Sequence, residues 1–124
     1  MTKQETIERG LQLRKEIYGN DAVEGRMRNA GEYGAPLQDL INGYAYGDIW
    51  QRPELARKQR SLVTIAINAA INRQFELRVH VQGALKNGCT PEEIREVLLH
   101  VALYCGIPAS MDAFKTTQEV LAAA

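Results

Sequence analysis

Two side chains that can exchange a proton, Glu76 and His80, stand four residues apart in a segment with a helical pattern. Residues at this spacing project from neighbouring turns of one helix face, so the carboxylate lies beside the imidazole. Histidine has an unperturbed pKa near neutral pH, and the chain contains only two histidines. General acid/base chemistry is therefore confined to few side chains, and this pair is the first candidate.

The second histidine, His100, has Tyr104 four residues later on the same face of a predicted helix. Its neighbours in the sequence include the apolar residues Leu98, Leu99 and Val101. Histidines in such a setting usually lie in a core or an interface, so the position favours packing. The alternative is that His100 and Tyr104 both face a substrate pocket.

Charge and length exclude several classes of function. Lysine and arginine together number 15, as do aspartate and glutamate, so the formal net charge is zero. Such a chain has no overall field to attract nucleic acid or an anionic membrane. The 124 residues suit a single domain, residues 1–124, of ordinary globular composition. The N-terminus does not have the pattern of a signal peptide and no apolar run reaches membrane-spanning length, so we expect a cytoplasmic protein.

The two cysteines, Cys89 and Cys105, form no redox or metal motif. They are too few for a disulfide framework, and their spacing is neither Cys-x-x-Cys nor that of a zinc ligand set. We therefore expect two buried, reduced thiols, with Cys89 packed between two helices.

The candidate residues must be positioned by helices, because apolar residues recur at helical spacing and almost nowhere alternate. The pattern predicts an all-α protein of about six helices. The predicted helices are residues 3–18, a second from Pro36 toward Trp50, a third from Pro53, a fourth at 73–87, a fifth from Pro91 and a sixth at 108–121. A polar, glycine-containing connection is predicted from the first helix to Gly34.

Several of these helices have features that bear on a site. Residues 62–71 are apolar nearly all round, which predicts a helix in the domain centre or in a subunit interface. Thr90 and Glu93 form a capping box around Pro91, which fixes the start of the fifth helix. A single shell of helices this short leaves apolar faces uncovered, so we expect a homo-oligomer. The first helix has a stripe at helical spacing made of Ile7, Leu11, Arg14, Ile17 and Tyr18.

The fourth helix is expected to hold the acid/base pair at the border of the core. Plotted at 100 degrees per residue, it has Leu77 and Val81 on one arc. Glu76 and His80 lie on the arc beside it.

Five segments, taken together, resemble one protein family. They read RSLVTIA at 60–66, ELRVH at 76–80, NGCTPEEIREVLLH at 87–100, YCGIPA at 104–109 and, upstream, YGDIWQRPEL at 46–55. In this order they are similar to the carboxymuconolactone decarboxylase family, over roughly three quarters of the chain. The resemblance implies an all-helical bundle of the alkylhydroperoxidase D-like type, assembled as a homohexamer.

The alkylhydroperoxidase D branch of the same superfamily carries Cys-x-x-Cys-x-x-x-His on the equivalent helix. In this chain the histidine of that motif is His80, whereas Arg73 and Glu76 stand at the two cysteine positions. Neither side chain acts as a thiolate nucleophile or a resolving thiol. We therefore do not expect dithiol-dependent peroxide reduction.

The resemblance implies a reaction, the decarboxylation of 4-carboxymuconolactone to the enol-lactone of 3-oxoadipate in aromatic-acid catabolism. No metal or organic cofactor is implied, because the electrons left by the carboxylate pass into the lactone carbonyl. The protein must then supply a hydrogen-bond donor to the developing oxyanion and a proton to the alpha carbon. Protonated His80, oriented by Glu76, is expected to do either.

The small carboxylated lactone also keeps a spectator carboxylate, which arginine is suited to bind. Arg73, one turn before Glu76, is the first candidate, with Arg52 or Arg28 from another segment. Trp50 is expected either to wall the pocket and exclude water or to pack in an interface.

Two other functions fit the same residues. One is a related acid/base reaction on another carboxylated lactone or a 2-oxo acid. The other is a non-catalytic helical oligomer that binds a small acidic metabolite or another protein, with Glu76 and His80 paired at its surface. A closed pocket that contains both residues and an arginine would favour an enzyme.

Overall fold

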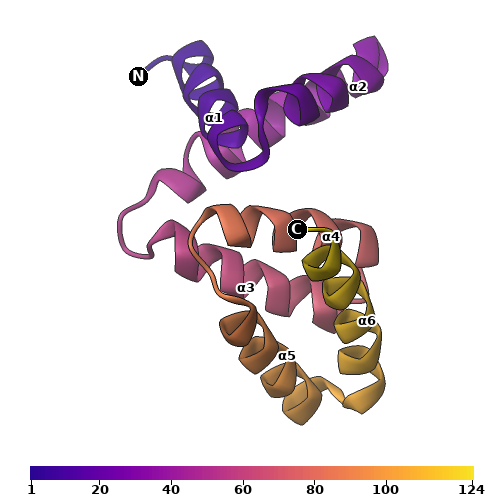
Figure 1. Cartoon of the computed structure of the whole chain (residues 1–124). Coiled ribbons are helices and arrows are strands. Elements are labelled where there is room, and N and C mark those ends of the chain that lie inside the picture. The colour runs from indigo at the N-terminus through magenta and orange to yellow at the C-terminus, as the bar shows by residue number, and fades with distance from the viewer. The chain divides into compact units, whose positions relative to one another are not determined.

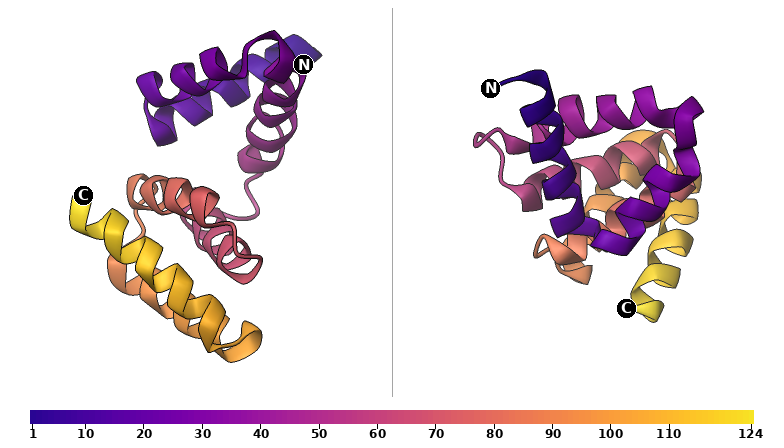
Figure 2. Two further views of the ribbon diagram at one scale, coloured as in Figure 1. Left: turned by 90° about the vertical axis from the view of Figure 1, so that its right-hand side faces the viewer. Right: turned by 90° about the horizontal axis from the view of Figure 1, so that it is seen from above.

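The computed structural model describes residues 1–124 and contains helices and no strands, which confirms the all-α prediction (Figures 1 and 2). The elements are α1 (Lys3–Tyr18), α2 (Asn20–Leu40), the π-helix η1 (Ile41–Tyr46), the 3-10 helix η2 (Ile49–Gln51), α3 (Arg57–Ala70), α4 (Gln74–Lys86), α5 (Pro91–Cys105) and α6 (Ile107–Ala123). No helix is both long enough and apolar enough to cross a membrane. The helices form two compact units, unit 1 (Met1–Leu55) and unit 2 (Ala56–Ala124).

Unit 2 is built from four helices around an apolar core. Helix α3 packs against α4 and α5, and α6 packs against α5 and α4. Figure 1 shows α5 and α6 side by side, joined by a sharp turn at Gly106, which has a φ of 101°. The buried core side chains include Ile65, Leu77, Val81, Ala84, Ile94, Leu98 and Ala113.

The predicted boundaries in unit 2 are mostly confirmed. Helix α5 starts at Pro91, with the Glu93 N–H donating to the Thr90 hydroxyl at 3.1 Å and the Thr90 N–H donating to the Glu93 carboxylate at 2.9 Å. Helix α4 ends before Gly88, whose φ of 91° stops the helix.

The predicted start of the third helix at Pro53 is wrong. Helix α3 begins at Arg57, because Ala56 has an extended backbone and its N–H donates to the Gln59 side chain at 2.9 Å. Pro53 lies in the turn before it.

Helix α3 is buried on one side only. Ile65 and Ala69 lie in the core of unit 2, whereas Val63, Ile67 and Ile71 are about half exposed. The all-round apolar pattern therefore corresponds to a core face and an uncovered apolar face.

Unit 1 is held together by a close backbone approach. Helix α1 packs on α2 and on η1. A Cβ atom on Gly10 would lie 1.6 Å from the carbonyl oxygen of Asn42, so only glycine fits at this crossing. The buried apolar residues of this unit are few, namely Leu13, Ile17, Val23 and Tyr46.

The predicted loop between the first helix and Gly34 is wrong, because these residues are helical from Asn20 onward. The helix was hidden by its polarity, since Val23 is its only buried residue. Gly31, with a φ of 57°, interrupts it and lets the chain change direction. Pro36 therefore lies inside α2 rather than in the first turn of a new helix.

Candidate active site

The acid/base pair is carried by α4, which is fixed at both ends. At its start the Thr116 hydroxyl of α6 donates to the Gln74 side chain at 2.6 Å, and at its end the Asn87 amide donates to the Ser61 hydroxyl at 2.9 Å. Leu77 of the same helix is fully buried in the core. The helix is therefore a rigid support for the side chains on the face beside Leu77.

Glu76 and His80 lie together on that face, as predicted. The Nε2 atom of His80 lies 4.0 Å from the Oε2 atom of Glu76. This distance is too long for a direct hydrogen bond but short enough for charge interaction with a protonated imidazole. The His80 side chain is 15% exposed and the Glu76 side chain 54%. His80 is thus largely enclosed by the unit, while its carboxylate partner faces solvent.

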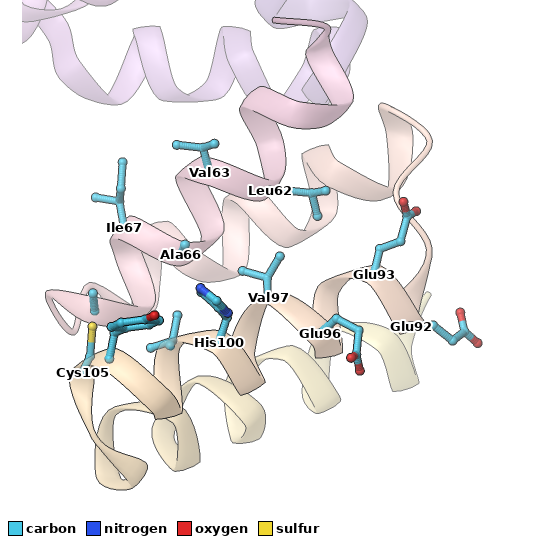
Figure 3. A pocket seen from close by; sticks show the side chains of 13 residues that line it. Leu62, Val63, Ala66, Ile67, Glu92, Glu93, Glu96, Val97, His100 and Cys105 are labelled. Atoms are coloured by element: carbon cyan, nitrogen blue, oxygen red, sulfur yellow. The ribbon is translucent and has the colours of Figure 1, made fainter.

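His100 and Tyr104 lie elsewhere, in an apolar groove between α3 and α5 of unit 2 (Figure 3). Their ring centroids are 5.0 Å apart, so the predicted pairing on one face is confirmed. Both side chains are exposed in the single chain, so His100 does not lie in a core, whereas its packing in an interface between copies stays a prediction. The groove has a volume of about 800 Å³, and neither His80 nor Glu76 lines it.

The groove is chemically uneven along its length. Figure 3 shows His100 projecting from α5 toward α3, with Cys105 at one end and three glutamates toward the other. Its walls are aliphatic side chains of both helices, namely Leu62, Val63, Ala66, Ile67 and Val97. Such a surface suits apolar contact more than the binding of a dicarboxylate.

The predicted arginines fall in both units. Arg73 caps the start of α4 in unit 2 and is exposed, one turn before Glu76. Arg28 and Arg52 belong to unit 1 and are also exposed, and the Nε atom of Arg52 lies 4.0 Å from the Glu54 carboxylate. Of the three predicted arginines, Arg73 is therefore the one next to the acid/base pair in unit 2.

Trp50 also belongs to unit 1, where it is half-buried. Its ring stacks on Tyr46 with centroids 5.3 Å apart and planes at 23°. The contact extends the small interior of unit 1 around Tyr46.

The sequence interpretation missed a buried polar cluster in unit 1. Arg14 is 4% exposed and donates from Nη1 to the side-chain oxygens of Asn42 at 2.8 Å and Gln38 at 3.0 Å. The Tyr18 and Tyr46 hydroxyls meet at 2.7 Å beside it. The available signal was Arg14 itself, a cation in register with the apolar stripe of the first helix.

The two cysteines differ from each other. Cys89 is buried as expected, its thiol donating to the Lys58 carbonyl at 3.5 Å, and burial raises its pKa. Cys105 is exposed at the end of α5, so the prediction of two buried thiols is wrong for this residue. Leu103 and Tyr104 next to it are exposed as well, so the end of α5 has an uncovered apolar face rather than a place in a core.

Comparison with known proteins gives a consistent result. The model of the carboxymuconolactone decarboxylase family matches residues 35–119, which include both histidines. The chain is 43% identical to nitrosuccinic acid decarboxylase of Metarhizium robertsii over 115 residues, 93% of this chain and 80% of the relative. It is 38% identical to 4-carboxymuconolactone decarboxylase of Acinetobacter baylyi over 120 residues, 97% of this chain and 90% of the relative.

Proposed function

The chain belongs to the carboxymuconolactone decarboxylase family, and from this premise we propose that it is a cofactor-independent carboxy-lyase whose substrate is 4-carboxymuconolactone. Two relatives similar over nearly the whole chain are decarboxylases, which supports the reaction class. The observation that carries the proposed mechanism is the enclosed imidazole of His80 beside the Glu76 carboxylate on α4.

The substrate supplies its own electron sink. When the bond between the ring carbon and the carboxylate breaks, carbon dioxide leaves and the electron pair passes through the conjugated double bond to the lactone oxygen. The resulting dienolate takes up a proton at the alpha carbon to give the enol-lactone. The protein therefore needs to stabilise one oxyanion and deliver one proton.

His80 is suited to both tasks. A largely enclosed imidazolium interacts more strongly with a developing oxyanion than an exposed one, because less water screens the charge. The Glu76 carboxylate beside it faces solvent, from which the donated proton can be replaced. Arg73 at the start of the same helix is the proposed partner of the spectator carboxylate, with Arg28 and Arg52 as the alternatives.

A second substrate, nitrosuccinate, is favoured by the relative that is 43% identical. Nitrosuccinic acid is a dicarboxylic acid with a nitro group on the carbon next to one carboxyl group. Loss of that carboxylate leaves an electron pair that the nitro oxygens accept as a nitronate, which is then protonated on carbon. Both substrates thus lose one carboxylate into a built-in electron sink and keep the other.

The test is a parallel assay of the purified protein with freshly generated 4-carboxymuconolactone and with nitrosuccinate, in which carbon dioxide release is measured. Release from the lactone at the higher kcat/KM supports the proposed substrate. Preferential release from nitrosuccinate transfers the proposal to the second one. No release from either compound by folded protein would contradict both.

A His80→Gln variant tests the mechanism. We expect kcat to fall about 100-fold or more with assembly unchanged, because the variant loses a positioned proton donor. His100→Gln is the matched control, since it removes the other histidine from the α3/α5 groove. An equal or larger loss in that control would place the reaction in the groove and contradict the role of His80.

We also propose that the protein assembles as a homohexamer, as the resemblance implies. The half-exposed apolar residues of α3 and the exposed Leu103 and Tyr104 of α5 support association, because isolated copies would leave these faces in water. Light scattering of the eluting protein measures its mass. A monomeric mass at micromolar concentration would contradict the assembly.

A further inference from the structure

Unit 1 buries a positive charge without a negative partner. The Arg14 guanidinium is 4% exposed, and its two hydrogen-bond acceptors are the neutral side chains of Gln38 and Asn42. No carboxylate lies within ion-pair distance of it. Buried arginines are normally matched by an acid, since removing a charge from water is costly.

A second unsatisfied group lies next to this cation. Asn42 is 1% exposed, and its side-chain oxygen accepts from Arg14 at 2.8 Å. The Nδ2 atom of the same amide is buried and has no hydrogen-bond partner. Nearly all buried polar groups in proteins are paired, so an unpaired donor beside an uncompensated cation marks a place for an acceptor.

The surroundings strengthen the positive character of the cluster. Arg26 adds a second guanidinium nearby, 5.4 Å above the Tyr18 ring. Asn42 belongs to η1, and single turns of π-helix occur frequently at functional sites. The cluster therefore combines a donor-rich cation, a free amide donor and an unusual backbone.

We propose that Arg14 and the Asn42 amide of unit 1 bind the carboxylate of a small acidic ligand. This carboxylate binding does not depend on the proposed reaction. Arg14 uses only Nη1 for its two protein acceptors, which leaves donors on Nη2 and Nε for a planar anion. Gln38 is only half-buried, so its amide oxygen is the acceptor that an entering carboxylate replaces.

Asn42→Asp is the decisive variant, because it supplies the missing negative charge in nearly the same shape. We expect the introduced carboxylate to pair with Arg14, so the melting temperature rises while added carboxylates bind at least about 10-fold more weakly. Asn29→Asp, on an exposed position of α2, makes the same charge change away from the cluster and is the control.

The measurement is calorimetric titration of each protein with succinate, a dicarboxylate that lacks an electron sink. Binding to wild type and Asn29→Asp, with weak or absent binding to Asn42→Asp, supports the site. Equal binding by all three proteins, or no succinate binding by the wild type, overturns it. A structural role alone would raise the melting temperature of Asn42→Asp and leave succinate binding unchanged.

Failure of the site and failure of the proposed reaction can be told apart. His80→Gln should bind succinate like the wild type, because His80 lies outside the cluster. Asn42-dependent succinate binding without turnover of either decarboxylase substrate would keep the carboxylate site and reject the reaction. Turnover of a decarboxylase substrate, together with succinate binding that does not depend on Asn42, would keep the reaction and reject the carboxylate site.

Discussion

The interiors of the two units are made of different chemistry. Unit 2 buries a continuous set of aliphatic side chains, and its buried polar groups are uncharged, such as Ser110, whose hydroxyl donates to the Leu98 carbonyl at 2.8 Å. Unit 1 buries few apolar residues, and Arg14 and Asn42 lie beside them. The first interior is stabilised by burial of apolar surface and the second by directional contacts.

This difference indicates what each unit contributes. Apolar burial is favourable wherever the shapes fit, so the core of unit 2 is a support for α4 and its acid/base pair. Burial of a cation among neutral partners lowers stability unless an anion completes it. The presence of such a buried cation favours a binding role for unit 1. Substitutions in the two interiors should therefore differ in their effects on stability.

The largest loss of stability is expected in the core of unit 2. Leu98→Ala should lower the free energy of unfolding by about 2–5 kcal/mol, because Leu98 is fully buried and the cavity cannot collapse completely. Urea unfolding followed by circular dichroism measures it. Leu99→Ala is the matched control, since Leu99 is 50% exposed. A loss below about 1 kcal/mol for Leu98→Ala would contradict the assignment of this core.

The next effect is expected at the backbone crossing of unit 1. Gly10→Ala should cost about 1–3 kcal/mol or more, because the added carbon would overlap the Asn42 carbonyl oxygen and force α1 away from η1. Trp50, the only tryptophan, stacks on Tyr46 in the same unit, so its fluorescence reports the change.

Gly25→Ala is the control for this substitution. A Cβ atom there meets only the Arg28 side chain at 3.7 Å, an ordinary contact. It should stabilise the helix by about 0.5–1 kcal/mol. Equal effects of the two substitutions would show that the close approach does not limit unit 1.

The fold of unit 2 could be predicted well from sequence because its signals are local. The apolar period of α4, the capping box at Thr90 and the glycine at position 88 each act within a few residues. The helix over residues 20–30 could not be predicted, since it has almost no apolar stripe. It packs against α1, a contact that no local sequence pattern records.

The contacts of the candidate site and of the Arg14 cluster also differ in how well the sequence predicts them. Glu76 and His80 are four residues apart on one helix, so their proximity follows from helix geometry. Arg14 and Asn42 are 28 residues apart, and their contact depends on how α1 crosses η1. Sequence patterns therefore predict sites carried by one element better than sites assembled from two.

A smaller effect is expected from the helix caps, which occur in both units. Thr90→Ala should cost about 1–2 kcal/mol, because Thr90 and Glu93 satisfy each other's backbone N–H. Thr2→Ala should cost only about 0.5–1 kcal/mol, since the Thr2 hydroxyl accepts a single bond, from the Glu5 N–H, at the start of α1. Denaturant midpoints of both variants measure the difference. A larger loss of stability for Thr2→Ala than for Thr90→Ala would contradict the expected order of the two caps.

The smallest effect is expected in the acid dependence of unit 2. The Lys58 ammonium lies 2.8 Å from the Glu93 carboxylate, and this hydrogen bond, followed by the one from the Thr90 N–H, holds the Glu93 pKa below its usual value of 4.5. A carboxyl group with a lowered pKa in the folded state stabilises the fold above pH 4.5. This contribution is lost as the pH falls below 4.5 through the folded pKa.

Glu93→Gln should therefore flatten the dependence of stability on pH below about 4.5, because the variant lacks the carboxyl group that titrates there. Near neutral pH the slope of stability against pH should change little. Denaturant midpoints measured between pH 3 and pH 7 test this, with Glu92→Gln as the control because it removes the same charge next to the pair. The carboxylate is exposed to solvent, so the difference should be small and should shrink further in high salt. An equally steep loss of stability in Glu93→Gln would mean that other carboxylates govern the acid response of unit 2.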